Sequence, residues 1–132
     1  MPDDAVTVVH RLIDQVWNGG DLAVLPELFT DPFLHSGRQD TVDGLRRWHE
    51  DDAATWAEAR YQVVDEVTDG TIVAVRWRAT ARQVGDWGPV AATGREITWE
   101  GVHFVTVEEG RITALWALAD AFGKARQLGA LD

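Results

Sequence analysis

Two side chains in the second half of the chain have the acid–base character that a catalytic site needs. Asp120 ends an alternating segment, with Trp116 and Leu118 on the same predicted face. A carboxyl group among such residues loses solvation, which raises its pKa toward the range useful for general acid–base catalysis. Asp120 could remove a proton next to a carbonyl and return it to a developing alkoxide. The competing interpretation is that it caps a helix that begins at the next residue.

His103 is the second candidate. It shares a predicted strand face with Trp99 and Val105, and strand pairing could bring it near Asp120. An imidazole in that position could orient the carboxylate or donate a proton to an enolate oxygen. A core histidine that is hydrogen-bonded to backbone is the competing interpretation.

The other polar residues indicate neither a metal site nor a nucleotide or serine-hydrolase site. The sequence has no His-x-His or His-x-x-x-His pair, no Gly-rich phosphate loop and no Gly-x-Ser-x-Gly motif, and Ser36 is its only serine. His10, His49 and the acidic run at residues 50–52 are expected to be solvated helix positions. We therefore expect a site that works without a metal.

Tryptophan is unusually frequent, with seven residues in a chain of 132. Such rings either fill a core or line an apolar pocket, and together they suit a flat polycyclic or polyene substrate. The strands and the third helix are expected to supply five inward rings, and a loop at the pocket mouth a sixth that could act as a lid: Trp77, Trp99 and Trp116; Trp48 and Trp56; and Trp87. For any one ring, core packing is the competing interpretation.

Helices followed by strands must position these side chains. Apolar residues at three- and four-residue steps predict helices at residues 6–17, 22–28 and 44–56, the last two capped by Asp21 and Asp43. Period-two alternation predicts strands at residues 61–67, 73–81, 97–107 and 112–120, with an extended piece at 33–36 and a closing helix at 121–128. This order predicts a single α+β domain over residues 1–132, in which helices cover one face of a curved sheet and form a cone with an internal cavity.

Charge and composition exclude several classes of partner. A net charge of −10 argues against nucleic acid, because phosphate binding needs clustered Lys and Arg. Arg76, Arg78 and Arg82 recur on one strand face, which we interpret as a solvated or subunit-facing surface. No apolar run approaches the ~18 residues of a membrane span. The absence of cysteine makes a cytoplasmic location the default expectation.

Several sequence fragments follow one another in a recognisable order: residues 16–22 (VWNGGDL), 33–35 (FLH), 73–77 (VAVRW), 85–95, 110–112 (GRI), Trp116, Asp120 and 127–131 (QLGAL). In this order they resemble the SnoaL-like polyketide cyclase family of the nuclear transport factor 2-like superfamily. The resemblance covers roughly residues 5–131. It implies a cone-shaped α+β barrel, often a dimer through its sheet, with a pocket that needs no metal or cofactor. It also implies that Asp120 is the acid/base and that His35 is a pocket histidine able to bind a substrate carbonyl, with a plain loop histidine as the competing interpretation.

The resulting hypothesis is a cofactor-independent cyclase that acts on an apolar, polyketide-like small molecule as a homodimer. Asp120, His103 and His35 would carry the chemistry. The family often has a glutamate or histidine just before the tryptophan of its closing strand, where this chain has Ala114 and Leu115, so Asp120 would work with histidines or nearly alone. The alternatives are an epoxide hydrolase, a ketosteroid-isomerase-like double-bond isomerase, or a non-catalytic binding or partner protein.

Overall fold

Helical segments open the fold. The computed structural model describes residues 2–131, so the terminal residues of the expected domain, 1 and 132, lie outside the described residues. Helix α1 (Ala5–Arg11) is capped by Asp4 and continues directly into the π-helix η1 (Leu12–Asn18). A short 3-10 turn, η2 (Leu22–Val24), is capped by Asp21 as expected and leads into α2 (Leu25–Leu28). The apolar stripe of these elements is buried against the sheet, including Val8, Val9, Leu12, Ile13 and Val16.

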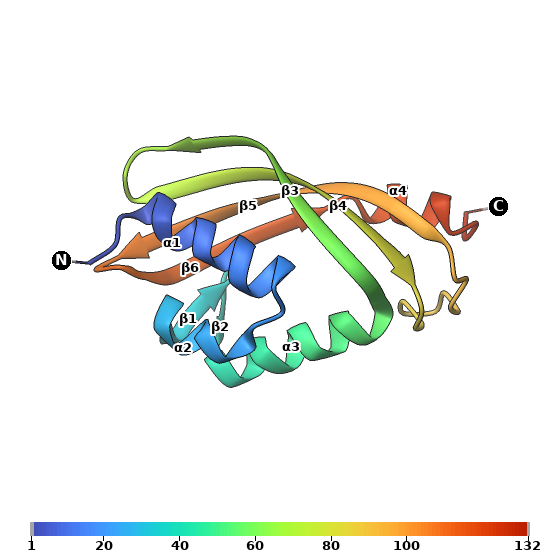
Figure 1. Ribbon diagram of the computed structural model, residues 1–132, viewed down its shortest axis with the longest axis horizontal. Helices are drawn as coiled ribbons and strands as arrows, with labels where there is room; N and C mark the ends of the chain where they lie inside the picture. Colours follow the sequence, from blue (N-terminus) through green and yellow to red (C-terminus); the bar gives the residue numbers. More distant parts are fainter. Residues whose placement is uncertain (1, 132) are drawn as a thin grey trace.

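One six-stranded sheet, in the order β2-β1-β6-β5-β4-β3, forms the rest of the framework. The strands are β1 (Phe29–His35), β2 (Arg38–Asp40), β3 (Trp56–Thr68), β4 (Ile72–Gln83), β5 (Glu96–Glu108) and β6 (Arg111–Ala119). β1 runs parallel to β6 and the other neighbours are antiparallel, so the sheet is mixed. Helices packed on one face of this curved sheet confirm the predicted fold class (Figure 1).

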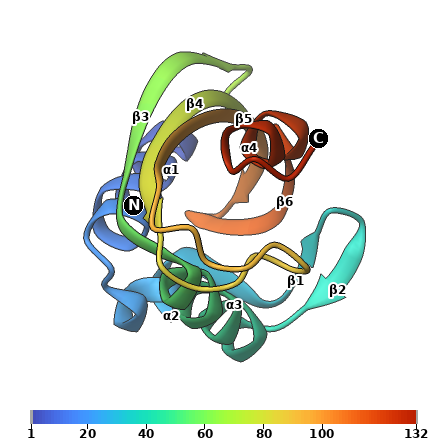
Figure 2. The same ribbon diagram turned by 90° about the vertical axis from the view of Figure 1, so that its right-hand side faces the viewer.

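Two helices lie near the ends of the curved sheet (Figure 2). α3 (Val42–Thr55) begins two residues before the predicted start, because Thr41 is its cap: Thr41 Oγ1 accepts a hydrogen bond from Gly44 N–H at 3.0 Å. Asp43, the expected cap, instead pairs with Arg46 on the helix surface. α4 (Ala121–Gln127) follows β6.

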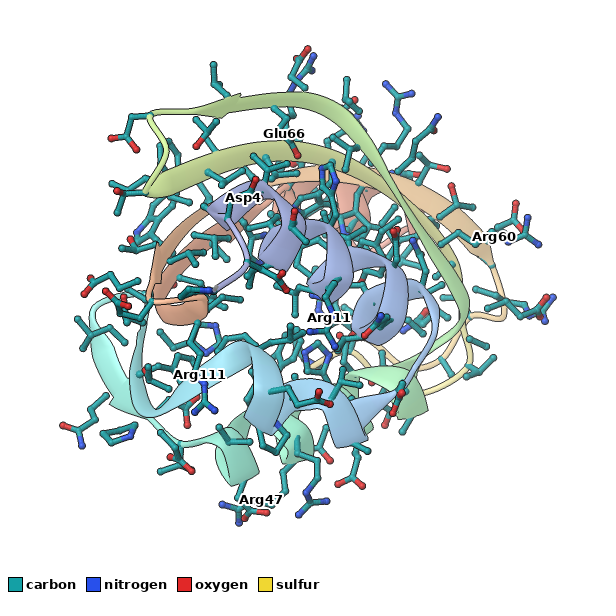
Figure 3. All side chains as sticks on the ribbon, turned by 60° about the vertical axis from the view of Figure 1, so that its left-hand side comes forward. Asp4, Arg11, Arg47, Arg60, Glu66 and Arg111 are labelled. Carbon is teal, nitrogen blue, oxygen red and sulfur yellow. The ribbon has the colours of Figure 1, made fainter. Side chains whose placement is uncertain are left out.

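The alternation of β4 and β5 was predicted correctly. On β4, Val73, Val75, Trp77, Ala79 and Ala81 are all buried, and on β5 the residues from Ile97 to Val107 alternate in the same way. The opposite face carries ion pairs. They join Arg76 to Asp65 and Glu100, Arg78 to Glu100, and Arg82 to Glu58, which confirms the expected polar face. Arg47 on α3 and Arg60 on β3 also point away from the interior (Figure 3).

A β-bulge in β6 makes one prediction about its faces wrong. Thr106 pairs with Ala114 whereas the next residue, Val107, pairs with Ile112, so Thr113 is an extra residue in β6. An extra residue exchanges the two faces of a strand beyond it. Ile112 and Leu115 are therefore both buried, while Trp116 is 45% exposed and Leu118 is 61% exposed. The expected inward face of Trp116 and Asp120 is thus the outer face, and the exposed Leu118 lies at the border of the cavity.

Candidate functional site

The concave side of the sheet, η1 and α3 enclose a cavity of about 610 Å³. This volume is typical of small-molecule sites. Its apolar wall includes aromatic rings from η1, α3 and three strands: Trp17, Trp48, Trp56, Tyr61, Trp77 and Trp99. Ionisable groups from five elements share the same space: His35, His49, Glu50, Asp52, Glu58, His103 and Lys124. Several potential acids, bases and hydrogen-bond donors therefore face one aromatic chamber.

His103 lies in this cavity as a neutral hydrogen-bond donor. Trp77 Nε1–H donates to His103 Nδ1 at 2.9 Å. In a neutral imidazole only one nitrogen carries a proton, so an accepting Nδ1 places that proton on Nε2. Burial, with smaller contributions from His35 and His49, lowers the pKa of His103 from 6.5 to about 3. Near neutral pH the imidazole is therefore uncharged, and its Nε2–H can polarise a substrate oxygen by donating a hydrogen bond to it.

An aromatic cluster that the sequence reasoning did not identify holds this histidine. The ring centroid of Trp17 lies 4.7 Å from that of His103 and 5.2 Å from that of Tyr61. Asn18, the last residue of η1, fixes Tyr61: its Nδ2–H donates to Tyr61 O at 3.0 Å and its Oδ1 accepts from Tyr61 N–H at 2.7 Å. A π-helix often marks a functional site. Here η1 ends at Trp17 and Asn18, whose contacts with Tyr61 join the helical layer to β3.

α3 contributes two ionisable groups that were expected to be solvated. His49 and Asp52 both line the cavity. Burial lowers the pKa of His49 from 6.5 to about 4, with His35 adding to the effect. Burial also raises the pKa of Asp52, opposed by Lys124. The sequence did contain a signal that His49 and Asp52 face inward. Residues 45, 49, 52 and 56 are spaced four, three and four apart, which places them on one face of the predicted helix. The first and the last of them are the buried Leu45 and Trp56.

His35 also reaches the cavity, at the end of β1. Its Nδ1 lies 3.3 Å from Asp40 Oδ2, across the short hairpin to β2. Asp40, at the end of β2, therefore orients this imidazole. The structure thus brings two of the three predicted catalytic residues, His35 and His103, into one cavity.

The third predicted residue, Asp120, lies elsewhere. It caps α4: its Oδ1 accepts a hydrogen bond from Gly123 N–H at 2.8 Å. A Cβ at position 123 would collide with the Asp120 carboxylate. Asp120 is exposed and is not among the residues that line the cavity. Its placement beside His103 among inward apolar residues was therefore wrong, because the bulge at Thr113 turns it to the other face; whether it acts in catalysis stays a prediction.

The six predicted tryptophans occupy different environments. Trp56, Trp77 and Trp99 are buried and line the cavity, and Trp48, 53% exposed, lines it as well. Trp87, on the loop after β4, is not a lining residue; its ring centroid lies 6.1 Å from that of Trp56. Trp116 lies on the outer sheet face with its ring 5.9 Å from Phe104.

Within residues 2–131, no group of three or more His, Cys, Asp or Glu side chains is arranged to hold a metal ion. No helix in the same range has the length and apolar character needed to cross a membrane.

Comparison with known proteins agrees with this architecture. The family model for SnoaL-like polyketide cyclases matches residues 7–128. No curated protein sequence matches the chain. Among solved structures, TsrD from Streptomyces laurentii is 24% identical, with coverage of 96% of this chain and 95% of TsrD and a TM-score of 0.85. A SnoaL-like polyketide cyclase from Agrobacterium tumefaciens is 23% identical, with coverage of 92% and 95% and a TM-score of 0.83. IdmH from Streptomyces antibioticus is 24% identical, with coverage of 94% and 97% and a TM-score of 0.83.

Proposed function

Because the chain belongs to the SnoaL-like polyketide cyclase family, we propose that its cavity closes a ring in a polyketide-like molecule by acid–base catalysis without a cofactor. The family membership supports a cyclase- or isomerase-type function. One observation supports acid–base ring closure in particular: the neutral donor His103 and the half-buried carboxyl group of Asp52 lie in one aromatic cavity.

The proposed step is an intramolecular aldol closure. Asp52, as the carboxylate, removes a proton from a carbon next to a carbonyl. The resulting enolate oxygen accepts a hydrogen bond from Nε2–H of His103, and His35 binds the second carbonyl. The enolate carbon attacks the carbon of this second carbonyl. The oxygen of the second carbonyl becomes an alkoxide and takes the proton back from Asp52. The product is an isomer of the substrate, so the step consumes no other reactant. The raised pKa of Asp52 makes its carboxylate a stronger base than a solvated one.

Asp120, the base that the sequence and the family resemblance indicate, competes with Asp52 for this role. Two matched substitutions separate them. Asp52→Asn removes the cavity carboxylate, whereas Asp120→Asn retains the helix cap, because asparagine caps helices as well as aspartate does. The assay is enzyme-catalysed exchange of the α-proton of an aromatic β-keto ester with D₂O, followed by ¹H NMR. It detects the proton-removal step without knowledge of the natural substrate.

The expected result is a loss of exchange of about 100-fold or more in Asp52→Asn, the usual contribution of a positioned base. Asp120→Asn should stay within about 3-fold of the wild-type protein. The reverse pattern would assign the base to Asp120 and reject the assignment to Asp52. Wild-type exchange no faster than the buffer rate would reject the acid–base function itself.

A double-bond isomerase is the second candidate, because one carboxylate and one neutral donor also suffice to move a proton between two carbons. It would catalyse the same exchange but give a product without a new ring. An epoxide hydrolase would instead incorporate oxygen from labelled water into its product. For the non-catalytic alternative the structure gives mixed support, because Asp120 is a helix cap whereas the cavity is open.

The outer sheet face supports a homodimer as part of this proposal. We call Phe104, Trp116 and Leu118 the outer apolar patch; they are 46%, 45% and 61% exposed on neighbouring strands. A second copy of this chain would remove these side chains from water. A cytoplasmic location, expected from the absence of cysteine, stays a prediction.

A further inference from the structure

Lys124 is a nearly buried lysine in a cage of indole rings. It lies on α4 and is 8% exposed. Its Nζ lies 4.4 Å from the ring centroid of Trp56, 4.8 Å from that of Trp87 and 4.3 Å from that of Trp99. Cation–π attraction of this kind favours the charged ammonium. Lysine is rarely buried to this extent unless its charge is paired.

No anionic partner pairs with this charge within residues 2–131. Lys124 Nζ takes part in no hydrogen bond and in no ion pair within 4.0 Å there. Asp52 lines the same cavity and its carboxylate raises the pKa of Lys124, but the larger effect of burial lowers that pKa. A ring face attracts the cation but does not replace the strong oxygen acceptors that an ammonium has in water. The N–H groups of Lys124 therefore remain available where its side chain meets the cavity.

Hydrogen bonds hold two parts of the cage in place: α4, which carries Lys124, and the loop that carries Trp87. Gln127 joins α4 to β5 through its side chain: Oε1 accepts from Thr98 N–H at 3.0 Å and Nε2–H donates to Thr98 O at 2.6 Å. The loop that carries Trp87 is fixed by the buried Gln83, whose Oε1 accepts from Thr93 N–H at 3.0 Å. A lysine held in this way is suited to bind a partner with little loss of conformational freedom.

We propose that Lys124 binds an anionic oxygen of the substrate, so that the cavity selects flat apolar molecules that carry a carboxylate. The ammonium meets the oxygen, and Trp56 and Trp99 contact the adjoining carbon skeleton. This inference rests on the proposed function only in taking the cavity as the substrate site. It adds a specificity-determining residue and a class of substrate, the aromatic or polyene acid.

Two probes of the same shape test this selection. 2-Naphthoate carries the carboxylate, and 2-naphthamide replaces it with a neutral group of similar size. Isothermal titration at pH 7 measures both against the wild-type protein, Lys124→Met and Lys124→Gln. Arg126→Met is the matched control, because Arg126 lies two residues further along and its guanidinium sits over the ring of Phe122, 5.7 Å from its centroid.

The wild-type protein should bind 2-naphthoate at least about 10-fold more tightly than 2-naphthamide, as expected for a charge-assisted hydrogen bond. Both Lys124 variants should lose this preference and still bind the amide, while Arg126→Met keeps it. The proposal is overturned if the wild-type protein shows no preference or binds neither probe at millimolar concentration. It is equally overturned if the preference survives in a folded Lys124 variant or disappears in Arg126→Met.

Thermal melting shows whether the variants are folded. Methionine keeps the unbranched stem within the indole cage, so Lys124→Met should melt at or above the wild-type temperature; the amide of Lys124→Gln provides a second neutral variant if it does not. Neither probe is turned over in this test. Its failure therefore leaves the proton-exchange test of Asp52 untouched, and the failure of that test leaves the binding result intact.

Discussion

Trp77 and His103, on neighbouring strands, are joined by a hydrogen bond in which the indole Nε1–H donates to imidazole Nδ1 at 2.9 Å. The bond does more than pack two rings together. It fixes the tautomer that leaves Nε2–H as the donor. Because it stabilises the neutral imidazole, it also acts in the same direction as burial on the pKa of His103.

Trp77→Phe removes the donor but keeps an aromatic ring, so His103 should populate both tautomers and its pKa should rise from about 3 toward its ordinary value. Imidazole ¹⁵N shifts measure both effects. Proton exchange of the β-keto ester should fall by about 10-fold or more as the oriented donor is lost. Trp99→Phe is the control for the ¹⁵N shifts alone, since Trp99 also lines the cavity; unchanged ¹⁵N shifts in Trp77→Phe would contradict the assignment.

The second prediction concerns pH and stability. The pKa values of His49 and His103 are lowered from 6.5 to about 4 and about 3, so below about pH 6.5 the unfolded chain binds protons that the native protein does not. The free energy of unfolding should therefore decrease as the pH falls from about 6.5 toward 3. The slope is at most about 1.4 kcal/mol per pH unit for each histidine.

Urea denaturation at a series of pH values from 6.5 to 4.5 measures this slope. The raised pKa of Asp52 acts with the opposite sign, because the native protein then holds a proton that the unfolded chain releases. The comparison is therefore made in an Asp52→Asn background, where adding His49→Gln should make the slope shallower. An equal slope with and without His49 would show that this imidazole is solvated, as the sequence suggested.

The third prediction concerns Gly101, which faces the ring of Trp77 on the neighbouring strand. A Cβ at this position would collide with the six-membered part of the indole. Gly101→Ala should destabilise the protein by about 1–3 kcal/mol, the usual cost of overpacking. In the Trp77→Phe background the shorter ring should relieve the collision, so the two changes should not be additive in urea denaturation. Additive effects would place the cost in the backbone instead.

The fourth prediction concerns the outer apolar patch. Trp116→Glu would place a charge in an interface between two copies and should convert a dimer into a monomer, as measured by light scattering after gel filtration. Val67→Glu is the control, since Val67 is 70% exposed on β3, outside the patch. A wild-type protein that is monomeric at micromolar concentration would reject the dimer.

The sequence predicted the site best where the local pattern alone determines burial. β4 and β5 pair without a break from Ile72↔Thr106 to Arg82↔Glu96, so simple alternation placed Trp77, Trp99 and His103 correctly. β6 differs because its bulge depends on its register with β5, which no property of its own residues indicates. Because the bulge was not predicted, Asp120 was assigned to the cavity face of β6, whereas in the structure it caps α4.

The missed groups on α3 have another cause. Acidic and histidine residues usually stay in water, so their polarity favoured a solvated helix face. In the fold, this face covers a cavity rather than a packed core, and a cavity wall accepts polar groups that a core would exclude. Helical spacing from Leu45 to Trp56 outweighs residue type for His49 and Asp52. Lys124 was missed for a similar reason, because its cage combines rings from β3, β5 and the loop after β4.

The extra residue at Thr113 determines which side chains of β6 face the cavity and which face the outer surface. Removal of a single codon there would turn Trp116 toward the cavity and Leu115 toward the surface, with no substitution at either of them. A one-residue insertion or deletion can thus exchange the pocket lining and the outer surface of β6 together. In alignments of related chains, a gap placed a few positions away from Thr113 would equate cavity residues with surface residues along the rest of the strand.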